Sequence, residues 1–329
     1  MYYLNVLPLF LFFSLTLGSY PQYDLEKAHE YFADFIKKYE RKYESAEEFR
    51  MRFEIFKKTL VQINEWNANS DYENSGFIIT QFADLENVPP CFDPSQMNNT
   101  MPLTEVKREF IVNAPDEIDY TTQGLVTEVK DQNPCGSCYI FAAIGNIEGV
   151  HAKQNPGQLV SLSEQQILDC MSEATCHGGY SLNVINYVAS SQGCMSEADY
   201  PYIEKTKTSC RFDAKKVKAK VNPAQTFNTP DDESLKGALS QNGAPLAVTV
   251  EATDSFTRWQ GADVFTPKDC TGGGANHAVL LVGYGKDANG VSYWKFKNSW
   301  GTGVGDGGYY KLNMQNNCSF GRVATCSAT

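Results

Sequence analysis

Two cysteines stand three residues apart in the run QNPCGSCYIF, at Cys135 and Cys138. A pair at this spacing can be a redox dithiol, half of a zinc site, or a structural disulfide cysteine beside a reactive thiolate. A redox dithiol would need a βαβ surrounding, and a zinc site would need a second close pair of ligands. The sequence shows neither, since Cys176-His177 matches ligand spacing poorly. We therefore expect no metal and favour a reactive thiolate at Cys138.

Cys138 is predicted to begin a helix. The residues after it carry Phe141, Ile144 and Ile147 along one face, and the pattern stops at the turn of residues 155–157, Asn-Pro-Gly. The ordinary thiol pKa, near 8.5, leaves little thiolate at neutral pH, and a helix N-terminus with a nearby imidazolium lowers that pKa. The position of Cys138 therefore suits a nucleophile.

A thiolate nucleophile needs a base, and the chain has four histidines: His29, His151, His177 and His277. His277 opens the run HAVLLVGYG, which is predicted to form a hairpin with SYWKFKNSW. A hairpin centred near residue 288 puts His277 across from residue 298 or 299, and Asn298 can accept a hydrogen bond from the ring. Taken alone, these two residues are ordinary strand-end and turn residues. Together with Cys138 they indicate nucleophilic catalysis.

The 329 residues are 42% hydrophobic and carry a formal net charge of -11. This chain is long enough for two packed units, and its acidity argues against nucleic acid or anionic membranes as partners. The apolar run Leu4 to Leu17 is shorter than a membrane span, so residues 1–19 are predicted to be a cleaved signal peptide. Export permits disulfides, and the nine cysteines after the isolated Cys91 are an odd number. One of them should stay outside a bridge.

The order of hydrophobic patterns predicts an α+β protein. Apolar residues recur at helical spacing between residues 24 and 67, which predicts two amphipathic helices. The run VPPCFDPSQMNNTMP, residues 88–102, has no periodicity and is predicted to be a linker. Helices are then expected from Cys138 and from Ser163, whereas the C-terminal part consists of short β-rich runs such as APLAVTVEA and GYYKLNM.

The chain resembles a papain-family cysteine protease of the cathepsin L-like branch over nearly all of residues 24–329. The resemblance rests on QNPCGSCYIF, SEQQILDC, CHGGY, NHAVLLVGYG and YWKFKNSWGTGVGDGGYYKL, in the order of the family. It implies a papain-like two-lobe fold, with a helical lobe near residues 124–225 plus the C-terminal arm. An antiparallel, β-barrel-like lobe follows near residues 226–320, plus the N-terminal arm. Residues 20–113 would be an inhibitory propeptide, cleaved near residues 109–114, and residues 114–329 the mature peptidase.

The resemblance also implies catalytic roles. Cys138 would be the nucleophile, His277 the acid and base, and Asn298 the residue that holds the imidazole. Gln132 would bind the oxyanion together with the backbone N–H of Cys138, and Trp300 would shield the bond between His277 and Asn298 from water.

Substrate binding is implied at a second set of residues. The backbone of Gly178 and Gly179 would bond the substrate strand. The pocket for the second substrate residue on the acyl side would be lined by Tyr180, Ser181, Ala278 and Val323. Because an apolar floor at Val323 leaves a buried charge unpaired, Leu, Val or Phe should be preferred there over Arg.

Three disulfides are implied by the resemblance: Cys135–Cys176, Cys170–Cys210 and Cys270–Cys318. Cys138 is then the thiol outside a bridge. We predict that the remaining pair, Cys194 and Cys326, forms an extra disulfide that ties the C-terminal arm to the helical lobe.

The sequence departs from the family pattern at several positions. Tyr139 and Val304 stand where tryptophan is usual, His177 replaces an asparagine, and Thr59 replaces an asparagine of the propeptide signature. Tyrosine at the first position occurs in active members. Val304 removes part of the surface on the leaving-group side, which affects the prediction for substrate binding there.

These features predict a cysteine endopeptidase without a cofactor, made as an inactive zymogen and activated by propeptide removal in acid. Carboxylates paired in the docked propeptide, such as Glu48 or Asp84, are expected to lose stabilising contacts as pH falls. The alternative is a catalytically silent homologue that binds or stores proteins. Expected partners are polypeptide substrates, the chain's own propeptide and cystatin-like inhibitors. We expect a monomer of the secretory pathway, in a lysosome-like acidic vesicle or outside the cell.

Overall fold

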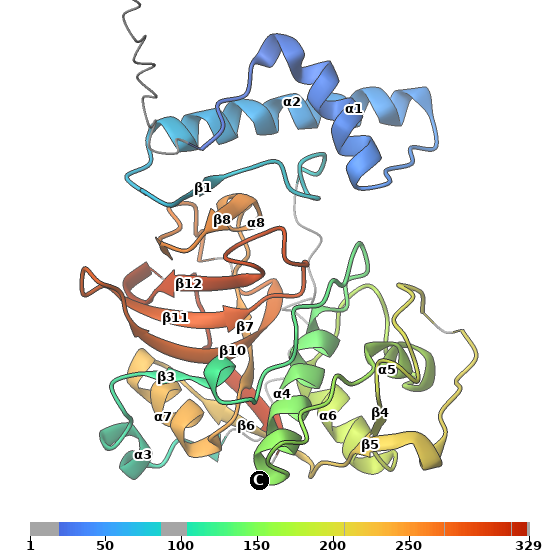
Figure 1. Cartoon of the computed structure of the whole chain (residues 1–329), viewed down its shortest axis with the longest axis vertical. Coiled ribbons are helices and arrows are strands. Elements are labelled where there is room, and N and C mark those ends of the chain that lie inside the picture. The colour runs from blue at the N-terminus through green and yellow to red at the C-terminus, as the bar shows by residue number, and fades with distance from the viewer. Residues whose placement is uncertain (1–19, 87–103, 207, 273, 317, 328–329) are drawn as a thin grey trace, which may run out of the picture.

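The structure is a computed structural model that describes residues 20–86, 104–206, 208–272, 274–316 and 318–327. The predicted signal peptide and Cys91 lie outside these ranges. Within them, three hydrophobic cores organise an N-terminal helical unit, a helical lobe and a sheet lobe. Figure 1 shows helices α1 (Ala28–Lys38) and α2 (Ala46–Ala68) above the sheet lobe, with the helical lobe beside it. None of the helices in the described ranges is long and apolar enough to cross a membrane.

The N-terminal unit covers residues 20–86 and confirms the two predicted helices. It adds η1 (Leu25–Lys27) and the short strand β1 (Ser75–Phe77). Helix α2 begins where Ser45 Oγ accepts the N–H of Glu48 at 3.0 Å, which satisfies one of the unbonded donors of the first turn. The two helices bury an aromatic stripe against each other, formed by Phe32, Phe35 and Phe56.

The helical lobe is built around α4 (Cys138–Gln154). It also contains α5 (Glu164–Cys170), α6 (Ser181–Ser190), η4 (Ala214–Lys216) and the two-stranded sheet of β4 (Cys194–Met195) and β5 (Val217–Ala219). Helix α4 packs against α6 on one side and against strands of the sheet lobe on the other. It is therefore buried around nearly its whole circumference, including Phe141, Ile144 and Ile147.

The sheet lobe holds a nine-stranded sheet in the order β2-β6-β13-β7-β10-β11-β12-β9, with β3 paired to β10 beside this path. Its strands are β2 (Thr104–Glu105), β3 (Ile118–Asp119), β6 (Ala224–Asn228), β7 (Leu246–Val250), β9 (Val264–Phe265), β10 (His277–Lys286), β11 (Ser292–Lys297), β12 (Tyr309–Asn313) and β13 (Val323–Ser327). The lobe also contains α3 (Arg108–Val112), η3 (Tyr120–Thr122), α7 (Asp232–Asn242), α8 (Asp254–Arg258), β8 (Trp259–Gly261) and η5 (Met314–Asn316).

The predicted α+β fold with a helical lobe and a mostly antiparallel sheet lobe is confirmed, but the sheet is neither wholly antiparallel nor closed. Most neighbouring strands are antiparallel, but β2 pairs with β6, and β9 with β12, in parallel. Among the described residues no ladder joins β2 to β9, so the sheet is open. Both end strands are only two residues long, which is too short to complete the staggered ladder of a closed barrel.

Three of the four predicted disulfides are present: Cys135–Cys176, Cys170–Cys210 and Cys270–Cys318. The fourth prediction is wrong, because Cys194 and Cys326 both keep buried thiols. Cys194 lies in the core of the helical lobe, with Sγ 3.7 Å from the carbonyl oxygen of Ser163, whereas Cys326 lies in the core of the sheet lobe. A hydrogen bond ties the C-terminal arm to α4 instead: the N–H of Ser327 donates to Asn146 Oδ1 at 2.9 Å.

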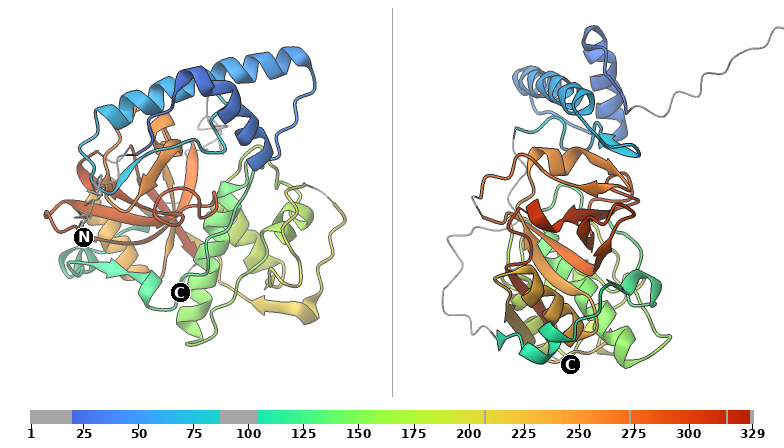
Figure 2. Two further views of the ribbon diagram at one scale, coloured as in Figure 1. Left: turned by 45° about the horizontal axis from the view of Figure 1, so that its top comes forward. Right: turned by 90° about the vertical axis from the view of Figure 1, so that its left-hand side faces the viewer.

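The N-terminal unit docks on one end of the sheet lobe. Strand β1 pairs antiparallel with β8 from Ser75↔Gly261 to Phe77↔Trp259. Both views in Figure 2 show α1 and α2 on the same end of the molecule, next to α8 and β8. This contact joins residues that are almost 190 positions apart in the sequence, as in the hydrogen bond from the N–H of Asn74 to Asp263 Oδ2 at 2.9 Å.

Candidate active site

Cys138 lies where the two lobes meet. It is the first residue of α4, so its sulfur is at the positive end of a 17-residue helix. The backbone N–H of Ala278, on β10 of the sheet lobe, donates to Cys138 Sγ at 3.4 Å. A helix N-terminus and an N–H donor both stabilise a thiolate relative to a thiol. The residue is fully buried in this structure.

His277 is held by Asn298. Asn298 Oδ1 lies 2.8 Å from His277 Nε2 and also accepts the backbone N–H of Ser299 at 2.8 Å. Because a backbone N–H donates to this atom, the amide oxygen rather than the amide nitrogen faces the ring. His277 Nε2 must then carry the proton, and Nδ1 is the basic nitrogen of the neutral imidazole.

His277 has a second contact beyond the hairpin ladder. The predicted pairing of β10 with β11 is present, with a shift between Leu281 and Gly283, and its last pair toward His277 is Leu280↔Lys297. His277 and Asn298 therefore lie beyond the paired stretch. The rings of His277 and Trp300 stack there with centroids 4.4 Å apart. Trp300 is buried and covers the imidazole from solvent.

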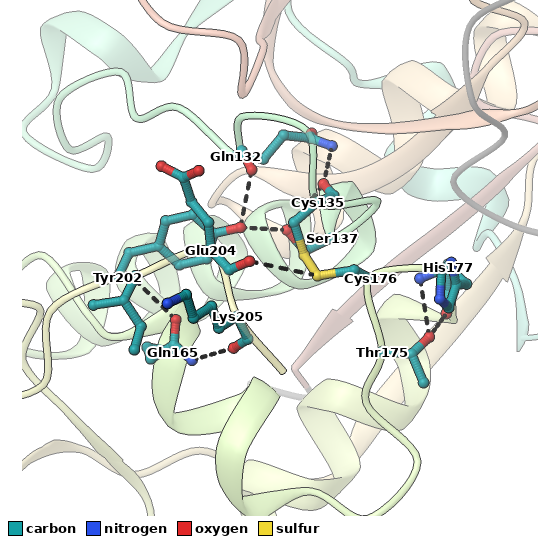
Figure 3. Close-up of a disulfide and its surroundings, with 12 residues drawn as sticks. Gln132, Cys135, Ser137, Gln165, Thr175, Cys176, His177, Tyr202, Glu204 and Lys205 are labelled. Carbon is teal, nitrogen blue, oxygen red and sulfur yellow. Dashed lines mark hydrogen bonds between the residues drawn. A yellow bond between two sulfur atoms is a disulfide. The ribbon is translucent and has the colours of Figure 1, made fainter. Parts of the chain in front are cut away.

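Gln132 connects the Cys135–Cys176 disulfide to the segment after β11 that carries Asn298. Its Nε2 donates to the carbonyl oxygen of Cys135 at 2.9 Å, and its Oε1 accepts the hydroxyl of Ser299 at 2.7 Å. Figure 3 shows Gln132 beside the disulfide. The hydroxyl groups of Ser137 and Tyr202 form a hydrogen bond nearby. An amide nitrogen is a hydrogen-bond donor, which is the chemistry that the expected oxyanion role of Gln132 requires.

Tyr139 has a structural role that the sequence did not reveal. Its hydroxyl donates to the carbonyl oxygen of Thr175 at 3.1 Å and accepts the N–H of the same residue at 3.0 Å. A Cβ added at Gly179 would lie only 2.5 Å from the Tyr139 ring. The ring therefore holds the Gly178-Gly179 segment against the start of α4, which makes this departure from tryptophan compatible with the site.

The other predicted substrate-binding residues lie on several elements. Gly178 has a φ of +99°, a backbone conformation that favours glycine. Tyr180 precedes α6, and Ser181 Oγ donates to the carbonyl oxygen of Tyr139 at 2.8 Å. Val323 begins β13 opposite Asn228, and its place in a substrate pocket stays a prediction.

Val304, the second departure from tryptophan, is buried in the core of the sheet lobe. The neighbouring Gly305 is fixed by two backbone hydrogen bonds. Its N–H donates to the carbonyl oxygen of Trp259, and its carbonyl oxygen accepts the N–H of Gly261. The segment thus keeps an ordered backbone without the larger ring.

A buried network of charged side chains lies between the two lobes. Lys130 Nζ donates to Glu148 Oε1 at 3.1 Å and to Glu164 Oε1 and Oε2 at 2.9 and 3.0 Å. Thr127 Oγ1 donates to Glu148 Oε2 at 2.6 Å and accepts from Lys297 Nζ at 3.0 Å. Lys297 directly precedes Asn298. The network therefore fixes β11, which carries Lys297, against α4 and α5, which carry Glu148 and Glu164. The sequence patterns did not predict this network.

This network predicts a pH dependence of stability. Burial raises the pKa of Glu164 from 4.5 to about 8, against the opposing effect of Lys130. Between these values the folded chain holds a proton that the unfolded chain has released, so the free energy of unfolding falls as pH rises. We expect a higher Tm at pH 5 than at pH 8, and Glu164→Gln should reduce the difference between the two. An equal difference in the variant would contradict this assignment. Calorimetry of the chain with Cys138→Ala, which prevents self-cleavage, measures both.

Asn298→Ala should lower kcat of the processed enzyme by about 10- to 10²-fold, because a hydrogen bond to a charged group contributes about 1.5–3 kcal/mol. Without the amide oxygen the imidazolium loses its acceptor and the ring loses its fixed tautomer. Asn298→Asp, which keeps an acceptor oxygen, should retain more activity. Steady-state kinetics on a peptide substrate distinguish the two variants, and equal activity of Asn298→Ala and the parent enzyme would exclude the role.

The N-terminal unit reaches the site with Phe82. The Phe82 ring packs on the edge of Trp300 with centroids 4.6 Å apart. Thr80 Oγ1 donates to the carbonyl oxygen of Thr257 at 2.8 Å. The backbone N–H of Ile78 donates to the carbonyl oxygen of Arg258 at 2.9 Å. Arg258 also donates to Thr59 Oγ1 at 3.3 Å, so this departure from the propeptide signature keeps a contact with the sheet lobe.

Comparison with known families matches two regions of the chain. The family described as papain family cysteine protease matches residues 114–328, and the cathepsin propeptide inhibitor domain matches residues 32–88. A viral cathepsin of Adoxophyes honmai nucleopolyhedrovirus is 33% identical over 342 residues, covering 99% of this chain and 98% of the relative.

Solved structures of propeptide-bearing proteases are also similar. A recombinant stem bromelain precursor has a TM-score of 0.77 at 30% identity, covering 92% of this chain and 98% of its own. Digestive procathepsin L 3 of the Tenebrio molitor larval midgut has a TM-score of 0.76 at 33% identity, covering 92% and 99%. The chain therefore belongs to the papain family of cysteine proteases and carries a cathepsin-type propeptide inhibitor domain.

Proposed function

We propose that the chain is an endopeptidase whose catalytic residues are Cys138, His277, Asn298 and Gln132. The observation that carries the proposal is the meeting of the two lobes at one sulfur. Cys138 is the first residue of α4, and its Sγ accepts a hydrogen bond from the backbone N–H of Ala278. The preceding residue is His277, whose Nε2 proton is directed at Asn298 Oδ1. A thiolate and an imidazolium in this setting suit attack on a peptide carbonyl.

In the acylation step the Cys138 thiolate attacks the carbonyl carbon of the substrate. The carbonyl oxygen becomes an oxyanion, bound by Gln132 Nε2 and the backbone N–H of Cys138, and each such donor contributes about 10²- to 10³-fold in rate. His277 gives its Nδ1 proton to the leaving amine, the C–N bond breaks, and the acyl group stays on the sulfur as a thioester. This proton transfer contributes about 10²- to 10⁴-fold.

In the second step water replaces the amine. Neutral His277 takes a proton from a water molecule, whose oxygen attacks the thioester carbon. The C–S bond breaks, the thiolate and imidazolium are restored, and the acyl product leaves as a carboxylic acid. Asn298 keeps the ring in one orientation through both steps.

Activation in acid belongs to the same proposal. Asp84 is buried in the N-terminal unit, where it accepts the hydroxyl of Tyr43 at 3.0 Å and pairs with Arg41 at 3.3 Å. Loss of this buried pair would leave the Arg41 guanidinium without its counter-charge and loosen the segment that carries Phe82. We accordingly place the enzyme in an acidic vesicle of the secretory pathway or outside the cell. Polypeptides would be its substrates and cystatin-like proteins its inhibitors.

The pocket predicted around Val323 gives a test of specificity. With an apolar floor, kcat/KM should be higher for Leu, Val or Phe than for Arg as the second residue on the acyl side, because an unpaired buried charge costs several kcal/mol. Matched fluorogenic peptides that differ only at this residue measure the ratio. A preference for Arg would place a different residue at the floor.

The function is tested by treating the acid-activated protein with a thiol-specific epoxide inhibitor. We expect mass spectrometry to find the label on Cys138 alone, and cleavage of a Leu- or Phe-containing fluorogenic peptide to stop. Cleavage that continues after complete labelling would refute the mechanism. If the processed and unlabelled protein cuts no peptide at all, the chain is the silent homologue, a binding or storage protein.

A further inference from the structure

The backbone of Gln132 is held by a tyrosine of the helical lobe. The hydroxyl of Tyr202 donates to the carbonyl oxygen of Gln132 at 3.0 Å, and this contact joins residues 70 positions apart in the sequence. Figure 3 shows two hydrogen bonds of the Tyr202 hydroxyl, one to Gln132 and one to Ser137. The catalytic steps do not involve Tyr202 directly, so any effect it has on the reaction must pass through these neighbours.

The second bond of Tyr202 reaches the residue before Cys138. The hydroxyl oxygens of Tyr202 and Ser137 are 2.9 Å apart. A phenol has one hydrogen, and the carbonyl oxygen of Gln132 can only accept it, so the Ser137 hydroxyl donates to Tyr202. Burial raises the pKa of Tyr202, so the phenol keeps its proton at any pH at which the enzyme would work. The Tyr202 hydroxyl therefore links Gln132 to the start of α4, and these two segments carry the expected oxyanion donors.

The backbone next to each end of this link has an uncommon conformation. Asn133, which follows Gln132, has a φ of +49°, and Glu204, two residues after Tyr202, has a φ of +61°. Residues other than glycine rarely adopt these values, and they keep them where the surrounding structure fixes them. Here the two side chains fix each other, because Asn133 Nδ2 donates to Glu204 Oε1 at 2.5 Å. The segment of Gln132 and the loop of residues 202–204 are thus joined at two points.

The loop of residues 202–204 is itself anchored to the helical lobe. The Tyr202 ring packs edge-on against Phe141 of α4, with centroids 5.1 Å apart. The backbone N–H of Tyr202 donates to Glu197 Oε1 at 2.7 Å. The backbone N–H of Ile203 donates at 2.9 Å to Oε1 of Gln165, a fully buried residue of α5. A side chain supported in this way can hold its hydrogen-bond partner in one position.

We propose that Tyr202 is a positioning residue that holds Gln132 in place relative to the start of α4, so that Gln132 Nε2 meets the oxyanion. This deepens the proposed function and rests on it, because it assumes that Gln132 donates to the oxyanion. A donor stabilises the developing charge only when it lies about 2.7–3.1 Å from the position of that oxygen. Loss of the fixed position therefore weakens binding of the transition state and leaves binding of the substrate unchanged.

Tyr202→Phe tests the proposal, because it removes the hydroxyl and keeps the ring that packs against Phe141. In the acid-activated enzyme we expect kcat to fall by about 10- to 10²-fold, since a misplaced catalytic group costs up to about 10²-fold in rate. KM should stay within about twofold of the parent value, because only the transition state loses a contact. Steady-state cleavage of a Leu-containing fluorogenic peptide gives both constants, with the active enzyme counted by titration with the thiol-specific epoxide. An unchanged kcat would overturn the proposal.

Tyr200→Phe is the matched control. Tyr200 is 1% exposed, and its hydroxyl donates to Asp169 Oδ2 at 2.8 Å and accepts the backbone N–H of Arg211 at 3.1 Å. The variant loses a buried, hydrogen-bonded hydroxyl two residues before Tyr202 without changing a contact of Gln132. We expect a lower Tm and the kcat of the parent enzyme. Equal losses of kcat in Tyr200→Phe and Tyr202→Phe would show that the rate follows the stability of this region, and the proposal would be wrong.

A double-mutant cycle asks whether Tyr202 acts through Gln132. In a Gln132→Ala background no side-chain donor is left to position, so Tyr202→Phe should lower kcat by less than about threefold. An equal loss in both backgrounds would contradict the route through Gln132. The parent enzyme separates this inference from the proposed function. If the parent cleaves no peptide, both fail, whereas an active parent whose kcat equals that of Tyr202→Phe keeps the function and removes only the inference.

Discussion

Replacing Cys138 with alanine is expected to lower kcat by about 10⁵- to 10⁶-fold, the scale of losing the nucleophile of a protease. The thioester can form only at this sulfur, and the activity that remains comes from the oxyanion donors and from binding. Because the variant cannot process itself, its propeptide is removed with a trace of parent enzyme that is then inactivated and separated. Steady-state cleavage of a Leu-containing fluorogenic peptide gives kcat.

The matched control is Cys194→Ala, since Cys194 is a second buried thiol of the same lobe. Burial raises the pKa of Cys194 to about 12, so it is not a thiolate at any pH at which the enzyme would work. We expect kcat of Cys194→Ala to equal that of the parent enzyme, with at most a lower Tm from the small cavity. Activity above about 1% in Cys138→Ala would exclude the proposed nucleophile, since only a small residue survives loss of a nucleophile.

The start of α4 at Cys138 and the hairpin that begins at His277 could be predicted because both depend on local sequence. The helix after Cys138 follows from apolar spacing, and the β10–β11 hairpin follows from two β-rich runs around a turn. The exact register did not follow. A Cβ at Gly283 would lie 2.0 Å from the carbonyl oxygen of Ile118, so β3 approaches β10 where the ladder shifts. A third strand that comes from the N-terminal side leaves no trace in the pattern of a hairpin.

The features that were missed depend on contacts between distant segments. An odd number of cysteines is compatible with one free thiol or with three free thiols. Cys194 and Cys326 lie in separate hydrophobic cores, and this separation, which the sequence does not show, leaves three thiols outside bridges. Glu148 and Glu164 lie on predicted helices, where charged residues usually face solvent. Their burial depends on Lys130, whose ammonium group comes from outside those helices.

The open sheet has the same kind of cause. The β-rich runs predict strands, but whether the two ends of a sheet meet depends on how long the end strands are and where they lie. Strand β2 comes from the region predicted to be propeptide, and its parallel pairing with β6 occupies one end of the sheet. Sequence periodicity in a two-residue strand carries no information, so this pairing could not be predicted.

The second large effect is expected on the rate of self-processing, when Phe77 of the N-terminal unit is replaced. Phe77 is 6% exposed and packs its ring on Trp259 of the sheet lobe, with centroids 5.6 Å apart, and on Trp66 of its own unit, 4.9 Å apart. Removing a buried phenylalanine ring costs about 3–5 kcal/mol, which corresponds to about 10²- to 10⁴-fold in the fraction of undocked propeptide. The initial rate of self-processing of Phe77→Ala should rise by about this factor.

Val61→Ala is the control, because Val61 lies on α2 of the same unit and is 40% exposed. Its self-processing rate should match that of the parent chain. After processing, the parent chain and both variants should have the same kcat, since the substituted residues leave with the propeptide. Gel densitometry of the intact zymogen at a pH where the parent chain converts slowly gives the rates. If the Phe77→Ala zymogen is processed no faster than the Val61→Ala zymogen, the contact between β1 and β8 does not hold the N-terminal unit in place. Inhibition must then depend on another contact.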